Sequence, residues 1–137
     1  GTLDAFCHNF KLLNEDTKKR LVIENDDSPN EYSVNDLYWG IHKRIGIPIT
    51  FDYFHHKFNT GTLTEEEALR MAATTWPKEI TQCCHYSESR RKEKLDESIR
   101  PQAHSDIIYN KINTYGLNPD IVIEAKLKEQ SIFNYAK

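Results

Sequence analysis

The chain has 137 residues, which is enough for one globular domain with a hydrophobic core and too few for two domains of ordinary size. Its 18 Lys and Arg residues stand against 21 Asp and Glu residues, a formal net charge of -3, so composition indicates no strongly basic nucleic-acid-binding surface. No apolar run approaches the roughly 20 residues of a membrane helix, and the first residues do not form a signal-peptide pattern. We therefore expect a soluble protein with no membrane partner.

The three cysteines, Cys7, Cys83 and Cys84, are an odd number, and the adjacent pair is poorly placed for a bridge. Without a second cysteine pair, packing as small apolar side chains is favoured over zinc binding. We expect free thiols and a reducing intracellular compartment, either the cytoplasm or the nucleus.

The first third of the chain predicts two helices with a strand between them. Apolar residues over 3–13 recur at the spacing of an amphipathic helix, which the polar segment 14–17 is expected to end. The continuous apolar run over 21–23 is typical of a strand covered on both faces. Ser33 is a suitable N-cap for a helix whose apolar positions keep a four-residue spacing until Gly46 ends it.

The same alternation continues to the end of the chain. Strands are expected over 47–52, 80–85 and 120–124, and helices over 64–76, 103–115 and 126–135. Thr64 and Glu67 form a capping-box pattern at the start of one helix, and Gly116 ends another. The highly charged segment 88–100 is expected to be an exposed loop or lid.

This order, a helix followed by four strand-helix units, predicts an α/β fold of parallel strands joined by right-handed crossovers. It fits a small open sheet, or about four consecutive βα units of a TIM (β/α)8 barrel, which normally takes about 250 residues. Chemistry in such barrels lies at the C-terminal ends of the strands. Because the candidate polar residues follow strand ends, we predict that residues 1–137 form part of a barrel.

Carboxylates and imidazoles follow all four predicted strands. They are Glu24, Asp52 with His55, His85 and Glu124. Such side chains hold divalent cations such as Mn²⁺, Mg²⁺ or Zn²⁺. Strands that bring them to one edge would build a metal site.

Most of these residues also have a simpler interpretation. An Asp-x-x-His pattern is unspecific, so Asp52 could cap a turn beside a surface His55. His56 competes with His55, and the spare histidine is expected to face solvent or to support the site. His85 could be a buried, hydrogen-bonded strand histidine, and His104 could cap a helix or lie on the surface.

Glu24 and Glu124 each follow an apolar triplet, where an unpaired buried carboxylate would be costly. Pairing with Arg20 or Lys126 would compensate for the charge, and so would a metal ion. The repetition of one arrangement at two strands favours the metal ion.

Several short segments have a distinctive sequence and order. The most specific is Leu-Val-Ile-Glu-Asn-Asp-Asp over 21–27, and the others follow it in the chain: 46–56, Thr75-Trp76, 85–87, 104–106 and 124–126. In this order they resemble the UV damage endonuclease family. The resemblance covers nearly the whole chain and corresponds to the C-terminal half of that family's barrel.

The resemblance implies a metal-dependent DNA repair enzyme, similar to endonuclease IV, that nicks damaged double-stranded DNA 5′ to UV photoproducts and other lesions. It implies two or three Mn²⁺ ions in the intact site, with Mg²⁺ or Zn²⁺ as alternatives, which polarise the scissile phosphate and generate a hydroxide nucleophile. Asn25, Asp26 and Asp27 would shape the turn around the site and support its ligands. By similarity the catalytic residues are Glu24, His85 and Glu124, and the metal ligands are Glu24, Asp52, His55, His85, His104 and Glu124.

The sequence departs from the family pattern in two ways. Cys83 stands where the family usually has a lysine, reported as carboxylated, so no modified lysine is expected. The first four βα units have no counterpart, so the implied partner is an N-terminal half barrel, and two open sheet edges would promote self-association. The alternatives are a xylose-isomerase-like sugar isomerase or epimerase, and a barrel remnant without catalysis.

Overall fold

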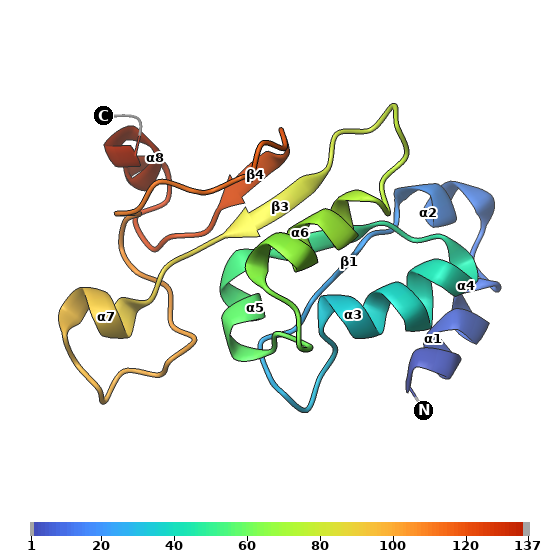
Figure 1. Cartoon of the computed structure of the whole chain (residues 1–137), viewed down its shortest axis with the longest axis horizontal. Helices are drawn as coiled ribbons and strands as arrows, with labels where there is room; N and C mark the ends of the chain where they lie inside the picture. Colours follow the sequence, from blue (N-terminus) through green and yellow to red (C-terminus); the bar gives the residue numbers. More distant parts are fainter. Residues whose placement is uncertain (1, 136–137) are drawn as a thin grey trace.

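The computed structural model describes residues 2–135, which form an α/β fold around one four-stranded parallel sheet. The strands are β1 (Ile23–Glu24), β2 (Ile49–Asp52), β3 (Cys83–Tyr86) and β4 (Asp120–Ile123). Each strand pairs in parallel with the next one, so the order in the sheet is the order in the chain (Figure 1). This is the arrangement of consecutive βα units in a β/α barrel, and the predicted fold class is confirmed.

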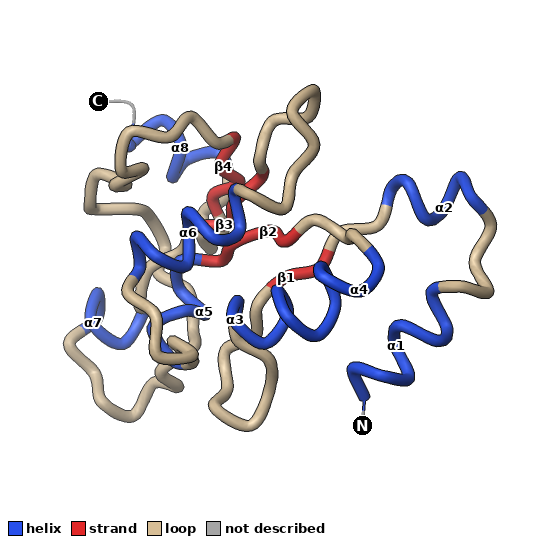
Figure 2. The backbone as a smooth tube through the Cα atoms, turned by 45° about the vertical axis from the view of Figure 1, so that its right-hand side comes forward, coloured by secondary structure: helices blue, strands red, loops and turns tan. Residues whose placement is uncertain are grey.

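Helices connect and flank these strands. They are α1 (Thr2–Phe10), α2 (Glu15–Arg20), α3 (Val34–Leu37), the π-helical segment η1 (Tyr38–His42), α4 (Lys43–Ile45), α5 (Tyr53–Phe58), α6 (Glu65–Ala73), α7 (Arg90–Lys94) and α8 (Glu129–Tyr135). Helices α3 and α6 pack against each other, and both contact β2 (Figure 2). None of the helices within residues 2–135 has the length and apolar character needed to cross a membrane. All three cysteines are free, as expected.

The caps predicted at Ser33, Thr64 and Gly46 are present, whereas Gly116 ends no helix. Ser33 Oγ accepts from the Asp36 N–H at 3.2 Å, and the Asp36 carboxylate accepts from the Ser33 N–H at 3.0 Å. Thr64 and Glu67 form the same reciprocal pair, with distances of 2.9 and 3.1 Å. Gly46 follows α4 with φ of +79°, a left-handed conformation that glycine adopts without steric cost.

The hydrophobic core lies between the sheet and the helices α3 and α6. Alternate residues of a strand point to opposite faces, and Ile49, Phe51 and Cys84 are fully buried on the face toward the core. Leu69 of α6 and Ile41 of η1 are buried in the same cluster. The opposite face of the same strands therefore carries polar residues such as Asp52 and His85.

The boundaries of the N-terminal elements differ from the expectation. The segment 14–17 does not simply end a helix, because Asn14 caps α2 by accepting from the Thr17 N–H at 2.8 Å. The expectation of a first strand covered on both faces is wrong, since β1 is short and Val22 is 44% exposed. Helix α5, which the sequence did not predict, starts directly after β2 because Asp52 caps it.

The predicted helix over 103–115 is wrong, because this segment consists of turns and irregular chain. The Glu88 carboxylate, which is buried, accepts from the backbone N–H of Tyr109 at 2.9 Å and of Asn110 at 3.1 Å. It also accepts from the Tyr86 hydroxyl at 2.7 Å. These bonds engage backbone donors that a helix would satisfy internally.

The interpretation of 88–100 as an exposed loop is also partly wrong. The segment starts at buried Glu88 and contains α7. From α7 the Glu93 side chain, only 4% exposed, accepts from the Asp106 N–H at 2.9 Å and from the Tyr109 hydroxyl at 2.7 Å. Two carboxylates therefore hold the chain that leads from β3 to β4.

We predict that Glu88→Ala lowers the free energy of unfolding by about 2 to 3 kcal/mol, because it leaves several buried donors without their charged acceptor. Urea denaturation measures this change. Glu97→Ala is the control, since Glu97 is 90% exposed and pairs with Arg91 at the surface, and it is expected to cost less than about 1 kcal/mol. Equal effects of the two substitutions would contradict a structural role for Glu88.

Candidate metal centre

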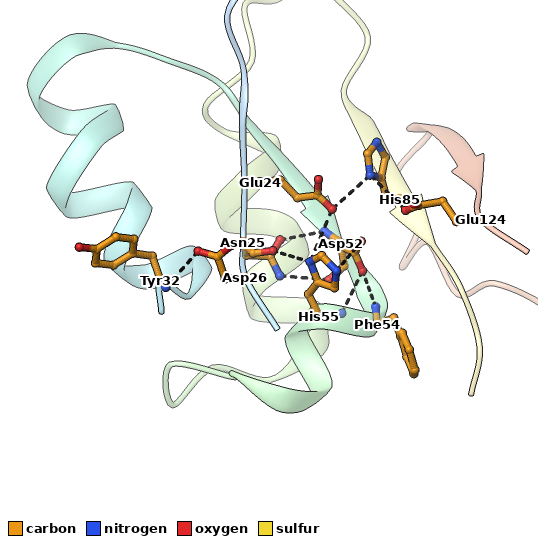
Figure 3. A network of polar contacts seen from close by, with 9 residues as sticks. All are labelled: Glu24, Asn25, Asp26, Tyr32, Asp52, Phe54, His55, His85 and Glu124. Atoms are coloured by element: carbon orange, nitrogen blue, oxygen red, sulfur yellow. Dashed lines mark hydrogen bonds and ion pairs between the residues drawn. The ribbon is translucent and has the colours of Figure 1, made fainter. Parts of the chain in front are cut away.

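Four side chains converge at the C-terminal edge of the sheet (Figure 3). Glu24 ends β1, Asp52 ends β2, His85 lies in β3 and Glu124 follows β4. One possible ligand atom from each lies within 4.8 Å of the others. The sheet register explains this meeting, because Asp52 pairs with His85, and His85 pairs with Val122, two residues before Glu124 on the same face.

Asp52 combines a backbone role with an unsatisfied oxygen. Its Oδ1 accepts from the N–H groups of Phe54 and His55, both at 2.9 Å, which caps α5. Its Oδ2 is buried and has no hydrogen-bond partner within the described chain. A buried acceptor without a partner costs about 1 to 3 kcal/mol, so this oxygen is suited to a cation.

Asn25 joins the ends of β1 and β2. Its side-chain oxygen accepts from the Asp52 N–H at 2.8 Å, and its amide nitrogen donates to the Asp52 carbonyl at 3.1 Å. The Asn25 carbonyl lies 2.7 Å from His55 Nδ1, so this ring nitrogen carries the proton. In this tautomer the Nε2 atom of a neutral His55 carries a free lone pair and lies 3.6 Å from Asp52 Oδ2. Histidines that bind metals are commonly held in this way, with the other ring nitrogen donating to a carbonyl.

The carboxylates of Glu24 and Glu124 lie beside the His85 imidazole and form no ion pair with an arginine or lysine within residues 2–135. His85 Nδ1 lies 3.1 Å from Glu24 Oε1 and 3.3 Å from Glu124 Oε1. The alternative pairing of Glu24 with Arg20 or Lys126 is wrong, since Arg20 pairs with Asp16 at 3.5 Å and Lys126 has no ion pair within residues 2–135.

This crowding changes the ionisation of Glu24. Burial, contact with the Asp52 carboxyl and the charges of Glu124 and Asp26 raise the pKa of Glu24 to about 9. A divalent cation would favour the ionised form and would satisfy Asp52 Oδ2. Carboxylate oxygens with an imidazole are a suitable donor set for Mn²⁺, Mg²⁺ or Zn²⁺, so the residues fit such an ion.

The remaining histidines lie outside this cluster of four. His104 does not cap a helix; it forms an antiparallel bridge with Ser89, and its ring centroid lies 5.9 Å from that of Phe54. His56 is buried against Phe51, with ring centroids 5.5 Å apart, so it does not face solvent.

Cys83 lies on the same strand face as His85, two residues earlier. Burial and the charges of Asp120 and Glu24 raise the pKa of its thiol. The thiol is therefore neutral near pH 7 and supplies neither the charge nor the oxygens of a carboxylated lysine.

Comparison with known proteins gives consistent matches along the whole chain. The family model described as UV-endonuclease UvdE matches residues 1–137. The chain is 36% identical to the UV-damage endonuclease of Schizosaccharomyces pombe over 142 residues, covering 99% of this chain and 23% of that protein. It is 32% identical to the UV DNA damage endonuclease of Clostridium perfringens over 134 residues, covering 93% of this chain and 31% of that protein.

The crystal structure of SacUVDE is similar to this fold, with a TM-score of 0.79 and 31% sequence identity. The match covers 97% of this chain and 44% of that chain. The chain thus spans less than half the length of each of these three proteins.

Glu24 makes the stability of the metal-free protein depend on pH. The pKa of Glu24 in the folded chain is about 9, above the ordinary value of 4.5, so the folded state binds the Glu24 proton more tightly than the unfolded state does. The stability that this protonated carboxyl contributes is fully present below about pH 4.5 and is lost as the pH rises through about 9. We therefore predict that Glu24→Gln becomes increasingly stable relative to the unaltered chain between about pH 5 and about pH 9. Urea denaturation with a chelator present measures this difference.

Glu79→Gln is the control for this series, because Glu79 is exposed and precedes β3 at the other end of the strand. It should show no gain in relative stability across the same pH range. A pH-independent difference between Glu24→Gln and the unaltered chain would contradict the predicted crowding of carboxylates.

Proposed function

The chain belongs to the UV-endonuclease family UvdE, and from this membership we propose that it supplies half of the barrel of a metal-dependent DNA repair endonuclease. The observation that carries the proposal is the convergence of Glu24, Asp52, His85 and Glu124 at the C-terminal ends of four consecutive parallel strands. Active sites of β/α barrels are built at this end of the strands.

We propose Mn²⁺ as the cofactor, with Mg²⁺ or Zn²⁺ as alternatives. Glu24, Asp52, His85 and Glu124 would hold it, with His55 beside Asp52 and His104 available on the loop that follows β3. When bound, such ions polarise a phosphate and lower the pKa of a bound water. The Asn25 carbonyl keeps the His55 ring oriented, and Asp52 is fixed by its two backbone donors.

The proposed substrate is damaged double-stranded DNA, nicked 5′ to UV photoproducts and other lesions. Support comes from the matched relatives, which are named as UV damage endonucleases. The proposed structural partner is an N-terminal half barrel. The strands β1 and β4 are the edges of the sheet, and Val22 and Val122, on the face that carries the cluster, are 44% and 48% exposed, so both edges and this face have room for further strands.

We predict that the chain binds Mn²⁺ and that the double variant Glu24→Gln, His85→Ala loses this binding by at least about 100-fold, because two donors are removed. Titration calorimetry measures the binding. The matched control is Glu79→Gln, His8→Ala, which removes the same two side-chain types from exposed positions. A remnant without a metal site would show no heat that differs between the two variants.

The nicking activity is tested in a chimera in which this chain replaces the matching segment of the Schizosaccharomyces pombe relative. We expect Mn²⁺-dependent nicking of UV-irradiated plasmid, and a loss of at least about 100-fold with Glu24→Gln. The same chimera with Glu79→Gln should stay active. A folded chimera that binds Mn²⁺ but leaves irradiated DNA intact would contradict the proposed activity.

A further inference from the structure

A second feature lies next to the cluster, on the side of Glu124. A cavity of about 350 Å³ is lined by Arg100, His104, Glu124 and Lys126, among others. Glu124 is common to the cavity and to the cluster, in which it contacts His85 at 3.3 Å. A group bound in this cavity would therefore lie beside the candidate metal centre.

Two cations of this cavity have no acidic partner. Neither the Arg100 guanidinium nor the Lys126 ammonium forms an ion pair or a side-chain hydrogen bond within residues 2–135. Two cations of the neighbouring helix α7 differ in this respect: Arg90 pairs with Asp106 at 2.5 Å, and Lys94 pairs with the same carboxylate at 2.8 Å. Arg100 and Lys126 are thus available to an anionic ligand bound beside Glu124.

Backbone bonds hold the two sides of the cavity together. The Lys126 N–H donates to the Ser105 carbonyl at 3.0 Å, and the Ser105 N–H donates to the Glu88 carbonyl at 2.8 Å. The Arg90 N–H donates to the Ala103 carbonyl at 2.9 Å. The segment that carries His104 is therefore fixed against the segment that carries Glu124 and Lys126.

A larger cavity of about 680 Å³ beside α5 and α7 is less suited to an anion. Its lining includes three cationic and three acidic side chains, namely Lys57, Arg91, Lys92, Glu88, Glu93 and Glu97. Arg91 already pairs with Glu97 at 3.3 Å. Lys57 and Lys92 form no ion pair within residues 2–135, but none of the residues that line this larger cavity belongs to the cluster of Glu24, Asp52, His85 and Glu124. The smaller cavity is chosen because its two unpaired cations lie beside Glu124.

We propose that Arg100 and Lys126 form a phosphate-binding subsite that holds a phosphodiester of the DNA backbone beside the metal centre. The inference rests on the proposed function, which it extends by naming the side chains that position the strand. Lysine and arginine side chains contact phosphates in nucleic-acid complexes, and Arg can bind phosphate oxygens through two parallel donors. A chain with net charge -3 can bind DNA in this way because the cations are local.

The test uses the full chain with a short fluorescent DNA duplex and a chelator, so that no metal contributes to binding. Anisotropy at several salt concentrations gives the affinity and its salt dependence. For Arg100→Gln, Lys126→Gln we expect the affinity to fall by about tenfold or more and the slope of log K against log salt to fall by about 2. The urea midpoint of each variant confirms that it is folded.

The matched control is Arg20→Gln, Lys78→Gln, which removes one arginine and one lysine that precede β1 and β3, at the opposite end of the strands. It should change the affinity by less than about twofold, because screening weakens distant charges. Equal losses in the two double variants, or no measurable DNA binding by the unaltered chain at low salt, would overturn the subsite.

Two further measurements complete the test. Tight binding of inorganic phosphate that the Arg100→Gln, Lys126→Gln variant loses, together with unchanged DNA affinity, would overturn the assignment to a DNA phosphodiester. Mn²⁺ calorimetry on this variant should show no weakening. Absence of Mn²⁺ binding by every form of the chain would refute the proposed function, whereas the DNA titration alone decides the subsite.

Discussion

Parallel pairing in register decides which side chains meet at the C-terminal edge of the sheet. Glu24 aligns with Thr50, and Asp52 aligns with His85. Because alternate residues share a face, these polar residues lie on the side away from the core, while Phe51 packs inward. The core and the candidate site are therefore two faces of the same strands, and a shift by one residue would exchange them.

The consequence is a crowded set of carboxylates whose ion-pair partners within residues 2–135 are histidines, not arginine or lysine. The raised pKa of Glu24 and the unpartnered Oδ2 of Asp52 both follow from this crowding. The strands and the Asn25 bridge hold the groups in place although their charges repel one another. Such conflicts between local preference and overall structure concentrate at functional sites.

The segment between β3 and β4 depends on a different kind of bond. Glu88 and Glu93 accept from backbone donors over 106–110, and the same segment carries His104 toward Glu124. The spacing of the isoleucines in this segment matches a helix, and Ile108 and Ile112 are indeed buried. Their burial is achieved by an irregular chain, because tertiary hydrogen bonds outweigh a local apolar pattern.

The sequence by itself determined the alternation of strands and helices in the first half of the chain, the caps at Ser33 and Thr64, and the polar residues at the four strand ends, because each depends on neighbours within a few positions. Only the tertiary structure decided the distances within the cluster, the bridge from Asn25 to a residue 27 positions away, and the irregular path over 103–115. Contacts between distant residues have no fixed spacing along the chain. They arise when packed strands bring those residues together, so no local sequence pattern predicts them.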